Sequence, residues 1–208
     1  MTKDPSEFSF YFQHIPKVGG SSLYKQLPGE YTQQYYKTCH CSDELKKHYK
    51  CNYNRIIRDH IGLNDAVITG QLTREELKTK EIIVFWRDPI DRFVSTCNHF
   101  DLEPLKMMER IKYPDQDEDY YRYLGKYAFY STASDLLKVD GKRVETTDLR
   151  LDQYDKIIEV FAKHGITIQN LGGDPRSKKY TRDHLTPYLH KFIRINYEED
   201  VEFFNSLK

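Results

Sequence analysis

Residues 8–27, FSFYFQHIPKVGGSSLYKQL, constrain the fold of this chain more than any other stretch. Aromatic residues occupy alternate positions at its start, which predicts a β-strand. Pro16 ends that strand and begins a turn, because proline has no N–H to donate to a neighbouring strand. Gly19 and Gly20 then allow positive φ angles and a close approach of the backbone to a ligand.

A short helix is expected directly after the glycines, carrying Leu23 and Leu27, with Ser21 or Ser22 as its N-terminal cap. A strand, a glycine turn and a helix N-terminus together form an anion cradle, because free backbone N–H groups and the helix dipole point at the ligand. Lys17 adds a positive charge at the rim. The segment therefore predicts a phosphate or sulfate ester as the ligand.

Length and composition indicate a single soluble domain spanning residues 1–208, with 38% hydrophobic and 31% charged residues. Basic and acidic residues number 32 each, so no bulk attraction to nucleic acid or to a membrane is indicated. No apolar run has membrane-spanning length, and the N-terminus lacks the layout of a signal peptide. These features favour a cytoplasmic protein, although a catalytic domain cut from a longer secretory-pathway enzyme would look the same.

The run EIIVFW at residues 81–86 is continuously apolar, which is typical of a central parallel strand covered on both faces. Asp88 is expected to cap the helix that follows, with Pro89 at its first position. This helix should reach about Phe100. Its buried stripe is formed by Ile90, Phe93, Val94 and Cys97, so Cys97 is expected to be a core residue.

Weaker patterns complete the predicted fold. Residues 101–138 are rich in tyrosine and are expected to form a mainly helical insertion. Helices are also expected after the capping box that begins at Thr73, over residues 154–161, and after Thr186-Pro187. Short strands are expected at residues 55–57, 66–69 and 166–171, and a turn or hairpin at residues 139–147. Together the elements predict an α/β fold with a mainly parallel central sheet and helices on both faces.

Ligands of such sheets bind beyond the carboxyl ends of the strands, where Lys17 and Arg87 are expected to meet. A nucleotide kinase or NTPase is a poor match, because its phosphate-binding lysine follows the glycines. Here Lys17 precedes Gly19-Gly20. The second strand also ends in Arg87 rather than in an acidic metal ligand, which indicates a second anion and no required metal.

Two stretches resemble a known family. HIPKVGGSSL at residues 14–23 resembles the 5′-phosphosulfate loop of sulfotransferases that use 3′-phosphoadenosine 5′-phosphosulfate (PAPS), nearest the carbohydrate, heparan-sulfate-type branch with its signature HIPKTGGTS. IVFWRDPIDRFVS at residues 83–95 resembles that family's 3′-phosphate motif, a strand followed by R-D-P-x-x-R-x-x-S. The two motifs occur in the family's order.

The resemblance implies a P-loop-like sulfotransferase fold with PAPS as co-substrate. Lys17 would contact the bridging oxygen and the sulfate, and Arg87 and Ser95 would hold the 3′-phosphate. The backbone around the 5′-phosphate would be that of Val18, Gly19, Gly20, Ser21 and Ser22. A basic loop with Arg176, Lys178, Lys179 and Tyr180 would close over the nucleotide. The acceptor would be a hydroxyl of a carbohydrate, with tyrosine or a small molecule as alternatives.

The general base is less clear from the sequence. Related enzymes often carry Gly-His after the middle strand, whereas this chain has Gly70-Gln71. His60, His14 and His99 are the candidates, and His60 is preferred because it follows the strand expected at residues 55–57. A non-catalytic nucleotide- or anion-binding protein that lost its base is the alternative function.

Three cysteines lie close together in a polar segment. Cys39, Cys41, His48 and Cys51 have a spacing that a zinc knuckle could use, although a C-x-C start is not the usual finger spacing. A disulfide within the segment and plain free thiols are the other two readings. None of them assigns these cysteines to the reaction.

Overall fold

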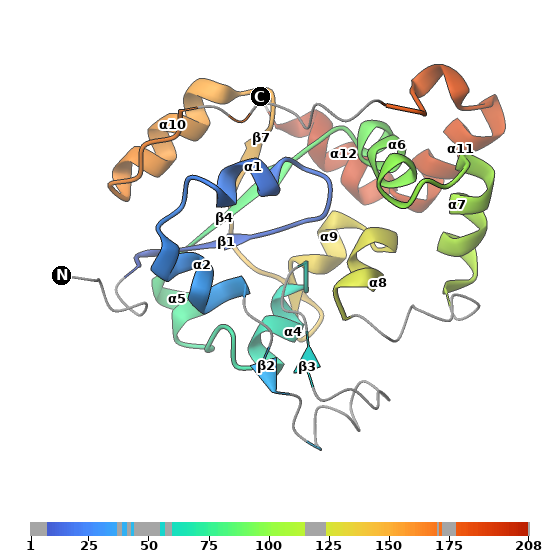
Figure 1. Ribbon diagram of the computed structural model, residues 1–208. Coiled ribbons are helices and arrows are strands. Elements are labelled where there is room, and N and C mark those ends of the chain that lie inside the picture. Colours follow the sequence, from blue (N-terminus) through green and yellow to red (C-terminus); the bar gives the residue numbers. More distant parts are fainter. Residues whose placement is uncertain are drawn as a thin grey trace.

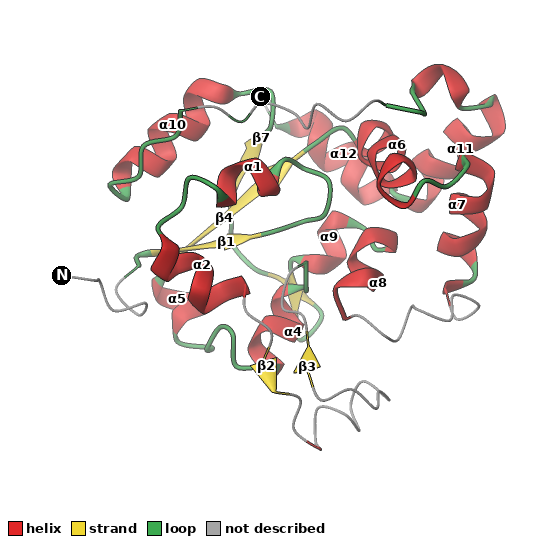
Figure 2. Cartoon of the chain, in the orientation of Figure 1, coloured by secondary structure: helices red, strands yellow, loops and turns green. Residues whose placement is uncertain are grey.

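The computed structural model of the protein describes residues 8–36, 39–40, 43, 55–56, 60–114, 124–169, 171 and 178–207. Three parallel strands form the central sheet in the order β1 (Phe10–Gln13), β4 (Glu81–Trp86) and β7 (Thr147–Arg150). These strands cross the middle of the molecule, and helices surround them (Figures 1 and 2). The predicted α/β class with a parallel sheet is thus confirmed.

Strands β1 and β4 are covered on both faces. All four residues of β1 are buried, as are the last five residues of β4. The central position expected for residues 81–86 is therefore confirmed. The alternating pattern at the start of the chain does not produce an exposed face, because Tyr11 and Gln13 are buried too. The outer edge of β1 is covered by α2 (Gly29–Tyr36), where the Tyr31 hydroxyl accepts a hydrogen bond from the Phe12 N–H at 2.6 Å.

Strand β7 was not expected from the sequence, because its residues TDLR are mostly polar. Its polar side chains form hydrogen bonds with side chains of the neighbouring strand β4. The Thr147 hydroxyl donates to Glu81 at 2.6 Å, and the Trp86 indole N–H donates to Asp148 at 2.6 Å. The prediction of a strand at residues 166–171 is wrong. Its described residues form no strand, and their apolar side chains fill the core instead.

Two other short strands were placed wrongly or only in part. Residues 66–68 belong to a helix, α4 (Leu63–Ile68), and Thr69 is its C-cap. The helix forms because Leu63 and Ala66 share one buried side at helical spacing. The strand expected at residues 55–57 is seen as β3 (Arg55–Ile56). It pairs antiparallel with β2 (Cys39–His40) and does not join the central sheet.

The helix after β4 forms as predicted. In α6 (Pro89–Phe100) the Asp88 carboxylate accepts hydrogen bonds from the N–H groups of Ile90 at 2.9 Å and Asp91 at 3.1 Å. Phe93, Val94 and Cys97 are buried and Ile90 is partly buried, so the predicted stripe is confirmed. Burial raises the pKa of the Cys97 thiol to about 12, which fits a core residue.

Most of the remaining helices were also expected. The capping box at Thr73 forms and precedes α5 (Glu76–Thr79). Thr186 caps α11, and Gly165, with φ 74°, follows the end of α10. A hairpin with Asp140-Gly141 at its turn joins β5 (Lys138–Val139) to β6 (Lys142–Arg143). The helices not yet given are α1 (Gly20–Tyr24), α7 (Pro104–Lys112), α8 (Leu124–Tyr130), α9 (Ala133–Leu136), α10 (Tyr154–Lys163), α11 (Pro187–Asn196) and α12 (Glu198–Ser206).

The apolar side chains form two clusters. One surrounds the sheet, and the other joins α6, α7 and α11, which lie together on one side of the molecule (Figure 1). The second cluster anchors the helix that begins directly after β4. Within the described part of the chain, no helix is both long and apolar enough to cross a membrane.

Candidate functional site at the carboxyl edge of the sheet

The loop between β1 and α1 has an unusual main chain. Lys17 and Gly19 both have left-handed backbone conformations, with φ of 67° and 93°. Helix α1 begins at Gly20 with Gly19 as its N-cap, and within the described residues no side chain bonds to that cap. The predicted cap at Ser21 or Ser22 is therefore wrong, since both lie inside the first turn. The Ser22 N–H donates to the Gly19 carbonyl oxygen at 3.1 Å, whereas the first N–H groups of a helix generally point outward from its start.

Both glycines are required by close packing, and Gly19 is required by its left-handed backbone as well. A Cβ atom on Gly19 would lie 2.7 Å from Leu151 Cδ1, in the segment that follows β7. A Cβ atom on Gly20 would overlap the imidazole of His14. The loop is thus clamped between two side chains, and only glycine fits at either position.

Arg87 brings the second motif to this loop. It follows β4 directly, and its Nη1 donates a hydrogen bond to the Lys17 carbonyl oxygen at 3.3 Å. Lys17 and Arg87 therefore meet at the carboxyl edge of the sheet, as predicted. Arg87 is half-buried, and this burial lowers the pKa of its guanidinium, against the opposing effect of Asp91 and Asp88.

A pocket of about 240 Å³ adjoins this arginine. Its walls come from the ends of β4 and β7, from the start of α6 and from α12. They are formed by one arginine, three carboxylates and three apolar side chains: Arg87, Asp88, Asp91, Asp152, Trp86, Leu151 and Phe204. Leu151 is also the side chain that closes on Gly19. The pocket and the glycine loop therefore share a wall at the same edge of the sheet.

The three candidate histidines converge although they come from distant parts of the chain. The His14 and His60 rings lie 4.0 Å apart between centroids. Phe129 of α8 lies 5.1 Å from His60 and 5.0 Å from His99, which stacks on it. His14 is buried against the glycine loop, His60 is half-buried with a left-handed φ of 64°, and His99 is exposed. His60 is therefore more accessible to solvent than His14.

Ser95 lies on the face of α6 that contacts the segment around Tyr180 and Arg182. Asp91, Ser95 and Asn98 share this face at helical spacing. The Asn98 side chain both accepts from the Tyr180 N–H and donates to the Tyr180 carbonyl, each at 2.9 Å. The ion pair between Lys179 and Asp101, at 2.8 Å, lies at the far end of α6 from Arg87. Lys178 is exposed, and Arg176 lies outside the described residues.

Two arginines were given no role by the sequence. Arg182 binds Asp88 at 2.9 Å and Asp91 at 2.6 Å, and its hydrogen bond lowers the pKa of the Asp91 carboxyl. Arg92, the second arginine of R-D-P-x-x-R, is 5% exposed and donates from Nε to the Pro16 carbonyl at 3.3 Å. The motif itself was the available signal for Arg92. The basic composition around residue 180 was the signal for Arg182.

In the described ranges, no group of three or more His, Cys, Asp or Glu side chains is placed to hold a metal ion. The cysteine-rich segment is only partly covered by this statement, because Cys41, His48 and Cys51 lie outside those ranges. Cys39 belongs to β2, away from the central sheet. The zinc-knuckle, disulfide and free-thiol readings of the segment all remain predictions.

The carboxyl edge therefore combines a lysine, a half-buried arginine, a glycine-built helix start and two imidazoles in contact at a tilted angle. Such a set can bind an anionic ester through charge and main-chain N–H groups and can accept a proton nearby. Comparison of the chain with protein-family models, with curated proteins and with solved structures found no match.

Proposed function

We propose that this protein is a sulfotransferase that moves the sulfuryl group of PAPS to an acceptor hydroxyl, with a carbohydrate as the expected acceptor. One observation carries the proposal. The two motifs that resemble the PAPS-binding motifs of that family lie 70 positions apart, yet Arg87 of one donates a 3.3 Å hydrogen bond to Lys17 of the other. A single ligand with two anionic groups would be contacted by both.

The donor would lie along the carboxyl edge of the sheet. Its 5′-phosphosulfate would take the main-chain N–H groups at the start of α1 and the ammonium of Lys17. Its 3′-phosphate would take the guanidinium of Arg87, with Ser95 on the adjacent face of α6. The pocket of about 240 Å³ that Arg87 lines would give room for part of the nucleotide.

The transfer step would need a base and a charge donor. His60 would accept the proton of the acceptor hydroxyl, whose oxygen would then form the new bond to sulfur. The bond from sulfur to the bridging oxygen would break, and Lys17 would neutralise the charge that develops on that oxygen, by analogy with phosphoryl transfer. His14 supports this arrangement, because its ring lies between His60 and Gly20.

Transfer of sulfate from PAPS to a panel of glycan, tyrosine-peptide and small phenol acceptors tests the function and separates the acceptor classes. Release of adenosine 3′,5′-bisphosphate that depends on one acceptor class would support it. Tight binding of the nucleotide without transfer to any class would favour the non-catalytic alternative. In an active protein, His60→Ala should remove the low-pH arm of the rate profile and leave nucleotide affinity unchanged, whereas unchanged kinetics would move the base to His14 or His99.

A further inference from the structure

The buried arginine of α6 contacts more separate segments than a helix residue needs for its own packing. Arg92 donates from Nε to the Pro16 carbonyl at 3.3 Å, and from Nη2 to the carbonyls of Ala128 at 2.9 Å and Ser131 at 3.0 Å. Its Nη1 forms an ion pair with Asp200 of α12 at 3.6 Å. One guanidinium therefore joins the glycine loop, the end of α8 and the C-terminal helix.

The ion pair between Arg92 and Asp200 lies where α8 ends and α9 begins. The cation faces carbonyls at the C-terminal end of α8. Asp200, which is 1% exposed, accepts hydrogen bonds from the N–H groups of Ala133 at 2.6 Å and Ser134 at 2.8 Å, at the start of α9. Each charge is thus stabilised by the helix end of opposite polarity, which explains how both can be buried.

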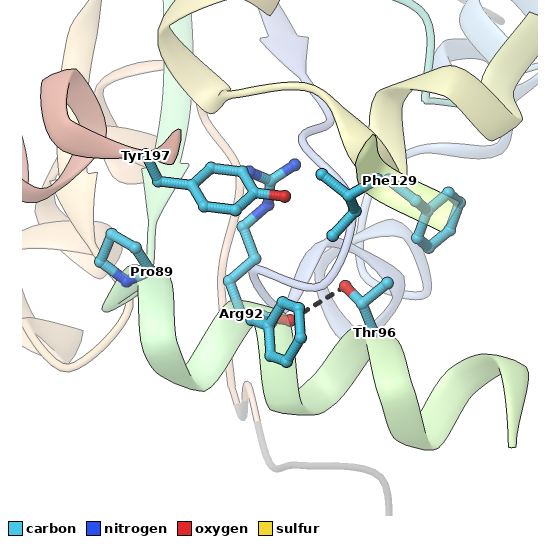
Figure 3. Close-up of a pocket in the computed structure, with 7 residues that line it drawn as sticks. Pro89, Arg92, Thr96, Phe129 and Tyr197 are labelled. Atoms are coloured by element: carbon cyan, nitrogen blue, oxygen red, sulfur yellow. Dashed lines mark hydrogen bonds between the residues drawn. The ribbon is translucent and has the colours of Figure 1, made fainter. Parts of the chain in front are cut away.

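Little space is left around this arginine. Figure 3 shows its side chain rising from α6 beside the ring of Tyr197, whose centroid lies 5.9 Å from the guanidinium carbon. On the helix itself, the Thr96 hydroxyl donates a hydrogen bond to the Arg92 carbonyl at 2.9 Å. The adjoining cavity of about 10 Å³ has room for about one water molecule. The close packing therefore restricts the orientation of the guanidinium, in addition to the hydrogen bonds that it makes.

We propose that Arg92 is a positioning residue for the glycine loop and that Asp200 of α12 holds it in place. The loop needs such support, because Lys17 has a left-handed backbone that a non-glycine residue adopts only at a cost in conformational energy. Arg92 of α6 binds the carbonyl of Pro16, and Arg87, which follows β4, binds the carbonyl of Lys17. Two arginines therefore hold the main chain at the strained position. The C-terminal helix is thereby linked to the anion-binding loop.

Amide hydrogen exchange of the ligand-free protein tests this link. Arg92→Lys keeps the charge but cannot direct donors to all these partners at once, and Asp200→Asn removes the charge that holds the arginine. In both variants, exchange in residues 15–20 should become at least tenfold faster, while exchange in residues 81–86 stays close to wild type. Lys80→Met is the matched control, because it removes another buried cation, paired with Glu76 at 3.2 Å, at the opposite end of β4.

Loop exchange at the wild-type rate in both variants would overturn the proposal, and so would equal acceleration in residues 81–86. If Arg92→Lys does not fold, Asp200→Asn carries the test, since it leaves the arginine in the chain. A second readout rests on the proposed function. Arg92→Lys should weaken binding of adenosine 3′,5′-bisphosphate at least tenfold. If the wild-type protein does not bind this nucleotide, the proposed function fails, while the exchange data still decide the role of Arg92.

Discussion

The two ends of the central sheet both carry polar side chains, but they use them differently. At the amino edge, Ser9 and His164 Nδ1 are 2.8 Å apart, and His164 Nε2 lies 2.9 Å from Glu81. Thr147 donates to the other oxygen of Glu81 at 2.6 Å. These side chains bind one another and tie the end of α10 to all three strands.

At the carboxyl edge, two arginines bind the main chain instead. Arg87 and Arg92 donate to consecutive carbonyls of one loop, and that loop has glycines where a Cβ would clash with Leu151 or His14. A pocket opens beside Arg87. Side chains that bind one another suit a structural role, whereas cations directed at a glycine-built loop suit the binding of an anion. We therefore place the proposed site at the carboxyl edge.

The largest contrast is expected from Lys17→Ala and Ser9→Ala. Loss of Lys17 should lower turnover by about two to three orders of magnitude, the scale for removing one preorganised charge donor from a transition state. Ser9→Ala, at the opposite edge, should leave turnover unchanged. Steady-state rates with PAPS and an active acceptor check both variants. Turnover near wild type in Lys17→Ala would remove this lysine from the mechanism.

A methyl group added to the loop should have the next largest effect. Gly20→Ala forces the new Cβ into the His14 ring, so either the loop or the ring must move. Nucleotide affinity should fall about tenfold or more, since overpacking typically costs about 1–3 kcal/mol. Gly29→Ala is the matched control, because a Cβ there meets no atom within 4 Å among the described residues. Equal calorimetric affinities in the two variants would show that the clamp on Gly20 does not matter for binding.

The amino edge should respond in stability alone. His164→Gln disturbs the contacts to Ser9 and Glu81, and should lower the free energy of unfolding by about 1–2 kcal/mol, the scale of one or two hydrogen bonds. Urea unfolding measures this change, and turnover per folded molecule should stay at the wild-type value. A loss of turnover per folded molecule would contradict this expectation, because it would mean that the amino edge affects the chemistry at the carboxyl edge.

The smallest effect is expected at Asp91 and depends on pH. The hydrogen bond from Arg182 lowers the pKa of the Asp91 carboxyl, so its stabilisation is complete above the ordinary carboxyl pKa of about 4 and is lost as pH falls through the lower folded value. Asp91→Asn should therefore cost about 0.2–1 kcal/mol at pH 7, as expected for a partly exposed pair, and nothing in strong acid. A stability difference that persists at pH 2 would contradict this assignment.

The sequence predicted the elements whose apolar pattern is strong. Strand β4, the cap and buried stripe of α6, and the meeting of Lys17 with Arg87 all follow from short local patterns. Strand β7 could not be found in this way, because its polar residues are stabilised by partners on β4 that lie about sixty positions away. The same limit applies to the helix cap at Gly19, where an added Cβ would meet Leu151, a residue that follows the distant strand β7.

The candidate site was also predicted only where one segment determines it. The contacts of the His60 ring with His14 and with Phe129 join segments that are far apart in the sequence, which no local pattern encodes. Arg92 sits inside a recognised motif, but its role depends on Asp200, more than a hundred residues later. Side chains whose partners come from distant segments are the part of a site that sequence patterns leave open.

Calorimetric titration of wild type and Arg87→Ala with adenosine 3′,5′-bisphosphate and adenosine 5′-monophosphate tests the central claim most directly. The wild-type protein should prefer the bisphosphate by about 2 kcal/mol or more, the scale of hydrogen bonds between charged groups. Arg87→Ala should lose most of that preference and bind the monophosphate almost as before. Equal affinities of the wild type for the two nucleotides would contradict the 3′-phosphate role of Arg87, and with it much of the sulfotransferase proposal.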